Sequence, residues 1–286
     1  MAAVSIGIPV YNGAATLRDA LECLRTQTFT DIEVIVSDNC STDGSAEIAE
    51  AFARADPRFR LVRQAENIGA RNNFRALIDL ATSDLFMWRA DDDLSNDTYV
   101  DVLKRGLDES PVASLAVAKT VFLNANGDVT HTYTFDAPAA NWRPLRTGQT
   151  LVRASPTWIY GLWKRDVLRG AMDRTGTAYP YLWAWDPMTL FSVLLDNGVV
   201  VDHEAVLIMR SMAAPRYSWR VPAREMSAMR RAFRKSCFIE FNRRKWSLPE
   251  RIVLTIYVLR FANRRVYRFL KMVRVWIREK LGIVKQ

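Results

Sequence analysis

The first 110 residues alternate short apolar runs with stretches whose apolar positions recur every three or four residues. Residues 4–9, 32–37, 59–62 and 85–88 have the composition and length of buried strands. Helical spacing follows in residues 16–28, in a stretch that runs through Phe52, and in residues 72–80 and 97–107. Strands that alternate with helices form a parallel sheet covered by helices. The pattern therefore predicts an α/β fold with a mostly parallel, Rossmann-like sheet.

Polar clusters follow three of these four predicted strands. Tyr11-Asn12-Gly13 comes after the first strand, Asp38-Asn39 after the second, and Asp91-Asp92-Asp93 after the fourth. In open α/β sheets, ligands bind at the carboxyl ends of the strands. Each cluster alone is ordinary turn chemistry. Three clusters that meet at one edge of a sheet predict a shared ligand site.

The three consecutive aspartates narrow the chemistry of that site. Adjacent carboxylates repel one another and are costly to bury, so they need a positive counter-charge. A Mg²⁺ or Mn²⁺ ion that holds a diphosphate supplies one, because both ions prefer carboxylate and phosphate oxygens. The alternative is a solvated acidic turn that caps the following helix.

The pattern changes beyond residue 113. Asn126-Gly127 lies between apolar runs at 117–123 and 129–133, which predicts a hairpin. Residues 136–163 are rich in loops and aromatic side chains, 186–195 are helical, and 199–209 form a closing strand. Two basic helices follow Pro222 and divide near residues 247–249. We expect a catalytic domain at 1–215, with halves at 1–110 and 111–215, and a helical extension at 216–286.

Charge is distributed unevenly along the 286 residues. Residues 210–286 contain 21 Lys and Arg against 4 Glu, a net charge of +17, whereas the remainder carries 19 basic and 27 acidic side chains, a net of −8. This charge predicts that residues 210–286 bind an anionic partner of their own. The three cysteines form no disulfide framework, which favours a reducing compartment. We expect neither a signal peptide nor a membrane-spanning helix.

Four motifs in order resemble those of the family 2 glycosyltransferases, which are nucleotide-sugar enzymes with the A-type fold. The likeness covers residues 4 to about 210, and its motifs are Ile8-Pro9-Val10-Tyr11-Asn12, Val34-Ile35-Val36-Ser37-Asp38-Asn39 with Ser41-Thr42-Asp43-Gly44, Glu66-Asn67-Ile68-Gly69, and Asp91-Asp92-Asp93. The resemblance implies the A-type glycosyltransferase fold, an inverting sugar transfer from a nucleotide sugar, most often a UDP-sugar, and Mn²⁺ or Mg²⁺ as cofactor.

The resemblance also implies roles for the matching residues. Tyr11 would lie against the nucleobase, and Asp38 would accept a hydrogen bond from it. The residues expected to bind the donor nucleotide are Pro9, Val10, Tyr11, Asn12, Asp38, Asn67, Gly69, Arg71, Asp91 and Asp92.

The family's Asp-x-Asp motif fits the acidic triplet in two registers. Asp91 and Asp93 match it directly, and we assign them to the metal. Counted back from Asn96, the motif instead places Arg89 at its first position and Asp91 at its second. Asp92 could then replace one member of the assigned pair.

Asp186 is the candidate catalytic base. The family often places a Glu-Asp pair at the start of a late helix, and here Trp185 stands where the Glu would be. A carboxylate at that position could take the proton of the acceptor hydroxyl. Its alternative role is a helix N-cap before Pro187. His203, by the same resemblance, is either a further metal ligand or a structural residue.

The basic C-terminal segment has two interpretations. Apolar residues recur at helical spacing between Arg251 and Gln286, beside a cationic face. This predicts a helix in the plane of an anionic membrane, at the inner, cytoplasmic face of the plasma membrane. The alternative is a helix packed on the protein itself. Nucleic-acid binding is disfavoured, because no recognised binding module accompanies the charge.

The sequence therefore predicts a peripheral membrane glycosyltransferase that acts on a lipid-linked glycan or polysaccharide acceptor. Two rivals are a sugar-phosphate nucleotidyltransferase and a non-catalytic membrane-docking protein. The first would need a Gly-rich, basic loop after the first strand, and Tyr11-Asn12-Gly13-Ala14 is not one. Homo-oligomerisation is left open.

Overall fold

A computed structural model describes residues 2–210, 221–266 and 269–280. The chain forms two compact units. The first comprises Met1–Asp136, Thr157–Met172 and Gly198–Ala213, and the second comprises Ala137–Pro156, Asp173–Asn197 and Ala214–Gln286. The expected domain boundary at residue 215 stays a prediction.

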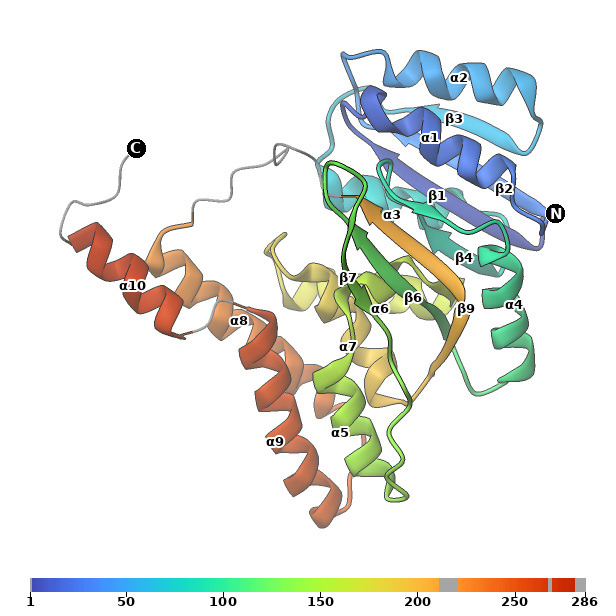
Figure 1. Ribbon diagram of the computed structural model, residues 1–286. Coiled ribbons are helices and arrows are strands. Elements are labelled where there is room, and N and C mark those ends of the chain that lie inside the picture. The colour runs from blue at the N-terminus through green and yellow to red at the C-terminus, as the bar shows by residue number, and fades with distance from the viewer. Residues whose placement is uncertain (1, 211–220, 267–268, 281–286) are drawn as a thin grey trace. The chain divides into compact units, whose positions relative to one another are not determined.

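The first unit is built on one large sheet with helices between its strands (Figure 1). Its strands are β1 (Val4–Val10), β2 (Ile32–Asp38), β3 (Phe59–Arg63), β4 (Leu85–Trp88), β5 (Leu94–Ser95), β6 (Leu115–Leu123), β7 (Val129–Tyr133), β8 (Leu162–Lys164) and β9 (Val199–Arg210). Its helices are α1 (Ala14–Arg25), α2 (Ser45–Ala55), α3 (Ala70–Leu80) and α4 (Tyr99–Glu109), and a 3₁₀ turn spans Pro156–Tyr160.

The strand order is β3-β2-β1-β4-β8-β6-β9-β5, and β7 pairs with β6. Strands β3, β2, β1 and β4 are parallel, which confirms the pattern predicted for the first 110 residues. The predicted hairpin is also present, as the antiparallel pair β6–β7. In the parallel half, the strands end at the edge where the sequence places its polar clusters.

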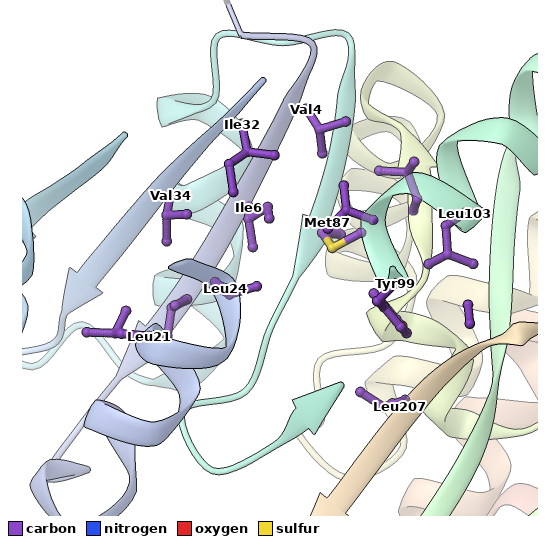
Figure 2. Close-up of a cluster of buried hydrophobic side chains, with 14 of the residues drawn as sticks. Val4, Ile6, Leu21, Leu24, Ile32, Val34, Met87, Tyr99, Leu103 and Leu207 are labelled. Carbon is purple, nitrogen blue, oxygen red and sulfur yellow. The ribbon is translucent and has the colours of Figure 1, made fainter. Parts of the chain in front are cut away.

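Alternation along β1 sends successive side chains to opposite faces of the sheet. Val4 and Ile6 belong to a core that also contains Leu21 of α1, Leu103 of α4 and Met87 of β4. Figure 2 shows these side chains gathered on one face, with the α1 and α4 residues facing the strands. Burial of such aliphatic side chains contributes about 1.5–3 kcal/mol each. This core fixes the strand ends that carry the polar clusters.

The second unit is helical among its described residues. It contains α5 (Arg143–Arg153), α7 (Trp185–Leu195), α8 (Ala223–Phe241), α9 (Leu248–Arg265) and α10 (Phe269–Lys280), while α6 (Arg165–Ala178) begins in the first unit and ends in the second. Helix α9 packs on α5 and α8, and α10 contacts α8. The described helices include none that is long and apolar enough to cross a membrane.

The predicted single helix over residues 251–280 was wrong. Helix α9 ends at Arg265, and α10 begins at Phe269. Val266 follows α9 with an extended backbone and a buried side chain, because it continues the face that packs inward. Residues 281–286, which belong to the predicted membrane segment 251–286, lie outside the described residues.

Candidate functional site

Three loops leave the sheet side by side at the carboxyl ends of β1, β2 and β4. Val10 pairs with Asp38, so the first two strands end together. The backbone N–H of Asn39 donates to Val10 O at 2.8 Å, and that of Arg89 donates to Gly7 O at 3.0 Å. These two backbone hydrogen bonds continue the pairing of the strands one residue beyond the ends of β2 and β4. The structure therefore brings the three predicted polar clusters to one edge of the sheet.

The loop after β1 is held from the side by the Ser-Thr-Asp-Gly-Ser segment before α2. The N–H groups of Asn12 and Gly13 donate to Ser41 Oγ and Ser45 Oγ, each at 2.9 Å. Ala14 N–H donates to Asp43 Oδ2 at 2.9 Å. Although burial raises the pKa of Asp43, its hydrogen bonds from Ser45 and Ala14 bring that pKa below its usual value.

That bonding leaves two predicted donor-site residues exposed at the sheet edge. Tyr11 is 39% exposed, and Asn12 is also exposed, with a backbone φ of 52°. The Asn12 Oδ1 atom accepts the N–H of Thr42 at 2.9 Å. Asn12 therefore stabilises the contact between the two loops, whereas the Tyr11 ring is available to a planar ligand.

A second network joins the loop after β2 to the start of α3. Asn39 is buried; its Nδ2 donates to Asn67 Oδ1 at 2.9 Å, and its Oδ1 accepts Ile68 N–H at 2.9 Å. Gly69 has φ +80°, a conformation that glycine adopts without strain, and α3 begins at the next residue. Arg71 lies in the first turn of α3 and is partly buried. The predicted pair Asn67 and Gly69 thus borders the same edge.

Asp38, the expected base-reading residue, is only 1% exposed. Its two carboxylate oxygens lie 3.3 and 3.4 Å from the N–H of Ser41. Pro9, two residues before Tyr11, is partly buried, and Val10 is buried. Asp38 therefore already helps to shape the loop, and a nucleobase would share its acceptor oxygens with Ser41.

The first aspartate of the triplet lies against the loop after β1. Asp91 is 7% exposed. A Cβ atom added to Gly13 would overlap its Oδ2 atom, although the Gly13 φ of −109° is open to any residue. Glycine is thus required here for space. The Gly13 cradle holds the Asp91 carboxylate against the loop that carries Tyr11, an arrangement that sequence reasoning did not identify.

The other two aspartates differ in burial. Asp92 is partly exposed, whereas Asp93 is 2% exposed. Burial, followed by the charges of Asp92 and Asp91, raises the pKa of Asp93 to about 7, against the opposing effect of Arg89. The Asp93 Oδ2 atom has no hydrogen-bond partner among the described residues.

Arg89 is buried behind this acidic turn. Its guanidinium donates to Leu94 O and to Ser95 Oγ, each at 3.1 Å, and lies 4.6 Å from the Tyr99 ring centroid. Its Nε–H, like Asp93 Oδ2, has no hydrogen-bond partner in the described part of the chain. Arg89 therefore bridges the two ends of the turn and opposes the charge of Asp93.

Arg210, the last residue of β9, holds the same turn from another side. Its Nε donates to Asp92 O at 2.6 Å, and its Nη1 forms an ion pair with Asp19 of α1 at 2.8 Å. Sequence reasoning missed this residue, because it lies 118 positions from Asp92 and no local pattern connects them. Arg89 was named only as a position of the alternative register, although a basic residue between an apolar run and the triplet is a signal for a buried counter-charge.

A metal ion at this edge would need ligands from its substrate. No three His, Cys, Asp or Glu side chains of the described residues gather into a complete metal site. Mg²⁺ and related ions commonly bind one or two carboxylates together with substrate phosphates and water. The cradled Asp91 and the partly exposed Asp92 provide such a carboxylate set. His203 is exposed, and its Nε2 lies 3.0 Å from Phe135 O, which fits the structural role.

In the second unit, Asp186 lies in the first turn of α7. The helix begins at Trp185, and Ala184 occupies the cap position with no side-chain cap. The predicted N-cap role of Asp186 is therefore wrong, because the helix starts one residue before it. Burial raises the pKa of Asp186 to about 6, against the lowering effects of its own N–H and of Arg265. Such a carboxylate is ionised near neutral pH and basic enough to accept a proton.

Four aromatic residues of the half predicted at 111–215 divide into two groups by burial: Trp158, Tyr160, Trp163 and Trp183. Trp158 and Trp163 are buried in the first unit: Trp158 packs edge-on against Phe135, and Trp163 Nε1 donates to Ile159 O. Neither can stack on a sugar. Trp183 is partly exposed in the second unit, where it joins Trp185 beside Asp186. Tyr160 is also partly exposed.

The model of the family described as Glycosyl transferase family 2 matches residues 5–161. Among curated proteins, the uncharacterised glycosyltransferase YibD of Escherichia coli K12 is 30% identical over 183 residues, which cover 58% of this chain and 49% of YibD. The abequosyltransferase RfbV of Salmonella typhimurium is 34% identical over 110 residues, which cover 37% of this chain and 32% of RfbV. The chain thus spans half or less of these relatives.

Two solved structures show the same fold. S. aureus TarS 1–349 in complex with UDP-GlcNAc superposes with a TM-score of 0.68 at 16% identity, covering 90% of this chain and 72% of the TarS 1–349 chain. The mannosyltransferase PcManGT of Pyrobaculum calidifontis, in complex with GDP-Man and Mn²⁺, gives 0.56 at 16% identity, covering 99% of this chain and 81% of its own. The predicted A-type fold is confirmed.

Proposed function

The chain belongs to glycosyl transferase family 2, and on this basis we propose that it transfers a sugar from a UDP-sugar to a glycan acceptor with inversion at the anomeric carbon. One observation carries the proposal: three loops meet at the carboxyl edge of the parallel strands, and the turn Asp91–Asp93 lies against the loop of Tyr11. The exposed Tyr11 ring at this edge can stack on a nucleobase, and the carboxylates can hold the cation that accompanies a diphosphate.

The donor base is assigned to the sheet edge between the first two loops. Tyr11 provides a ring for stacking, and Asp38 provides acceptor oxygens for a base N–H. Uracil is the base in this proposal, as in TarS, which was solved with UDP-GlcNAc; guanine, as in PcManGT, which was solved with GDP-Man, is the alternative. Asn67, Gly69 and Arg71 border the phosphate-binding side. In this assignment, Arg71 adds positive charge near the nucleotide.

The cation is assigned to Asp91 and Asp92. When bound, Mn²⁺ or Mg²⁺ would stabilise the negative charge that develops on the departing diphosphate. The sequence-based pair was Asp91 and Asp93. Asp93 is less suited, because it is buried on the side of Arg89, whose positive charge repels a cation. Asp92 is partly exposed, and the acidic triplet also allows it to replace one member of that pair.

Asp186 is assigned as the catalytic base. Its carboxylate would remove the proton of the acceptor hydroxyl as the oxygen attacks the anomeric carbon, and the bond to the diphosphate breaks in the same displacement. A pKa of about 6 leaves this group ionised at neutral pH. Trp183 and Trp185 beside it are candidates for stacking on the acceptor sugar.

The acceptor is a lipid-linked glycan or a growing polysaccharide in this proposal. Relatives support that class: RfbV is an abequosyltransferase, and TuaG of Bacillus subtilis, 34% identical over 67 residues, is a putative teichuronic acid biosynthesis glycosyltransferase. We assign the basic helices α9 and α10 to attachment at an anionic membrane surface, on the cytoplasmic face. The cysteines, all free, suit a reducing compartment.

A thermal-shift panel tests the donor assignment. UDP, GDP, CDP and matching nucleotide sugars are added with and without Mn²⁺, and hydrolysis or transfer is followed by release of nucleoside diphosphate. UDP should raise the melting temperature more in the presence of Mn²⁺. Asp91→Asn should lose this metal-dependent shift, while Asp136→Asn, at an exposed position outside the site, should retain it. Equal shifts for both variants would exclude the acidic turn from the donor site.

A further inference from the structure

Helix α9 has one face packed inside the second unit. Leu254, Val258 and Phe261 are almost completely buried. Tyr257 lies against Gly148 of α5, where a Cβ atom would overlap its ring. The N-terminus of the helix is also capped, because Ser247 and Glu250 form a reciprocal capping box. This face already has its partner within the chain.

The opposite face of α9 carries an aliphatic stripe in contact with solvent. Leu248 is 73% exposed, Ile252 is 57% exposed and Ile256 is 49% exposed. Their spacing of four residues aligns them along the helix. Single exposed aliphatic residues are ordinary, but three in line on a well-packed helix form a continuous apolar surface. The structure shows no element that covers it among the described residues.

The charge around the stripe has one sign. Every other exposed position of α9 is a proline, an asparagine or an arginine: Pro249, Arg251, Arg260, Asn263 and Arg264. The acidic residue of this helix, Glu250, is used by the capping box. Glu240 of α8 is likewise occupied, because it pairs with Arg174 and Arg244. The exposed face of α9 is therefore aliphatic and cationic.

We propose that the stripe Leu248–Ile252–Ile256, flanked by Arg251, Arg260 and Arg264, inserts into the interface of an anionic lipid bilayer. This inference rests on the proposed membrane attachment and identifies the surface that makes it. Aliphatic side chains enter the acyl boundary of a bilayer, while the arginines contact lipid phosphates. A second copy of the chain is a poorer occupant, because its equivalent face would bring like charges together.

The stripe is only part of the apolar set that helical periodicity selects between Arg251 and Gln286. That set contains Ile252 and Ile256 but also Leu259, Val266, Leu270 and Val273. Val266 is buried, and Leu259 and Val273 are partly buried; the Leu270 side chain lies outside the described residues. Removing Val266 would disturb the packing of the second unit, so a membrane test built on it could not separate folding from binding.

The test measures sedimentation of the full chain with vesicles. Phosphatidylcholine vesicles containing 30 mol% phosphatidylglycerol are compared with pure phosphatidylcholine. We expect binding to the anionic vesicles, reduced but not abolished by salt, because screening acts on the arginines and not on aliphatic burial. The variant Ile252→Gln/Ile256→Gln should bind about 100-fold more weakly, since burial of each side chain favours transfer by a factor of roughly 10.

A matched control substitutes Val112, which is 85% exposed in the first unit. Val112→Gln should bind vesicles like the unchanged protein. Both variants should keep the melting temperature and the UDP-dependent shift, which separates failure of the membrane surface from failure of the donor site. The proposal is overturned if the double variant binds anionic vesicles normally. It is also overturned if the unchanged chain ignores vesicles or forms a dimer that the double variant dissociates.

Discussion

Replacement of Asp186 by asparagine should stabilise the protein at neutral pH and remove sugar transfer. The substitution preserves size and polarity but cannot accept a proton. In the folded chain, burial raises the pKa of this carboxyl from 3.8 to about 6. Between pH 3.8 and about pH 6, the folded state therefore still carries a proton on Asp186 that the unfolded chain has already released. The contribution of this bound proton to the free energy of unfolding is complete below pH 3.8, and it is lost as the pH rises through about 6.

The size of the effect follows from this difference in pKa. One pKa unit corresponds to about 1.4 kcal/mol, so the ionised carboxylate should cost the fold about 3 kcal/mol above pH 7. Part of this change in the free energy of unfolding already occurs below pH 4. Between pH 4 and pH 8, the free energy of unfolding of Asp186→Asn should therefore rise relative to that of the unchanged protein by about 2–3 kcal/mol.

Urea unfolding at a series of pH values measures this difference, and other titrating groups cancel because both proteins contain them. Asp166→Asn is the matched control, since Asp166 also lies in the first turn of a helix but is exposed. Transfer by Asp186→Asn should fall ~10²–10⁴-fold while UDP binding is retained. A pH-independent difference would refute the desolvation of Asp186, and normal transfer would refute its role as base.

Four other substitutions test the donor edge and the helical packing. Gly13→Ala should weaken Mn²⁺-dependent UDP binding in calorimetry, because its methyl group displaces Asp91; unchanged binding would remove Asp91 from the site. Asp92→Asn should lose Mn²⁺ binding, whereas Asp93→Asn should keep it, and the reverse result would restore the sequence-based pair. Gly148→Ala should lower the free energy of unfolding by ~1–3 kcal/mol through overpacking, although alanine favours helix. A stabilised variant would contradict the packing of α9 on α5.

The parallel half of the fold could be predicted because its signals are local. Each of β1 to β4 is an apolar run bounded by turn residues, and the helices between them repeat their apolar residues at a helical period. The positions of the polar clusters then follow from topology alone, since parallel strands end at the same edge. Tyr11, Asp38 and Asp91 accordingly border the edge to which the motifs assigned them.

The direction of individual side chains could not be read in the same way. Residues of a turn follow no period, so the sequence could not show that Asp93 is buried while Asp92 is partly exposed. Helix α9 presents a different difficulty, because apolar residues occur on both of its faces. Periodicity reveals an apolar stripe but does not say which stripe has a partner: Val258 is buried, whereas Ile252 lies in solvent.

The placement of Arg89 and Arg210 explains how the fold accommodates three adjacent carboxylates. Both arginines donate to backbone carbonyls of the turn, Leu94 O and Asp92 O, and so fix its path. Arg89 also opposes the charge of Asp93 from inside the core. The positive charge of Arg89 therefore acts on Asp93, which is the buried end of the turn.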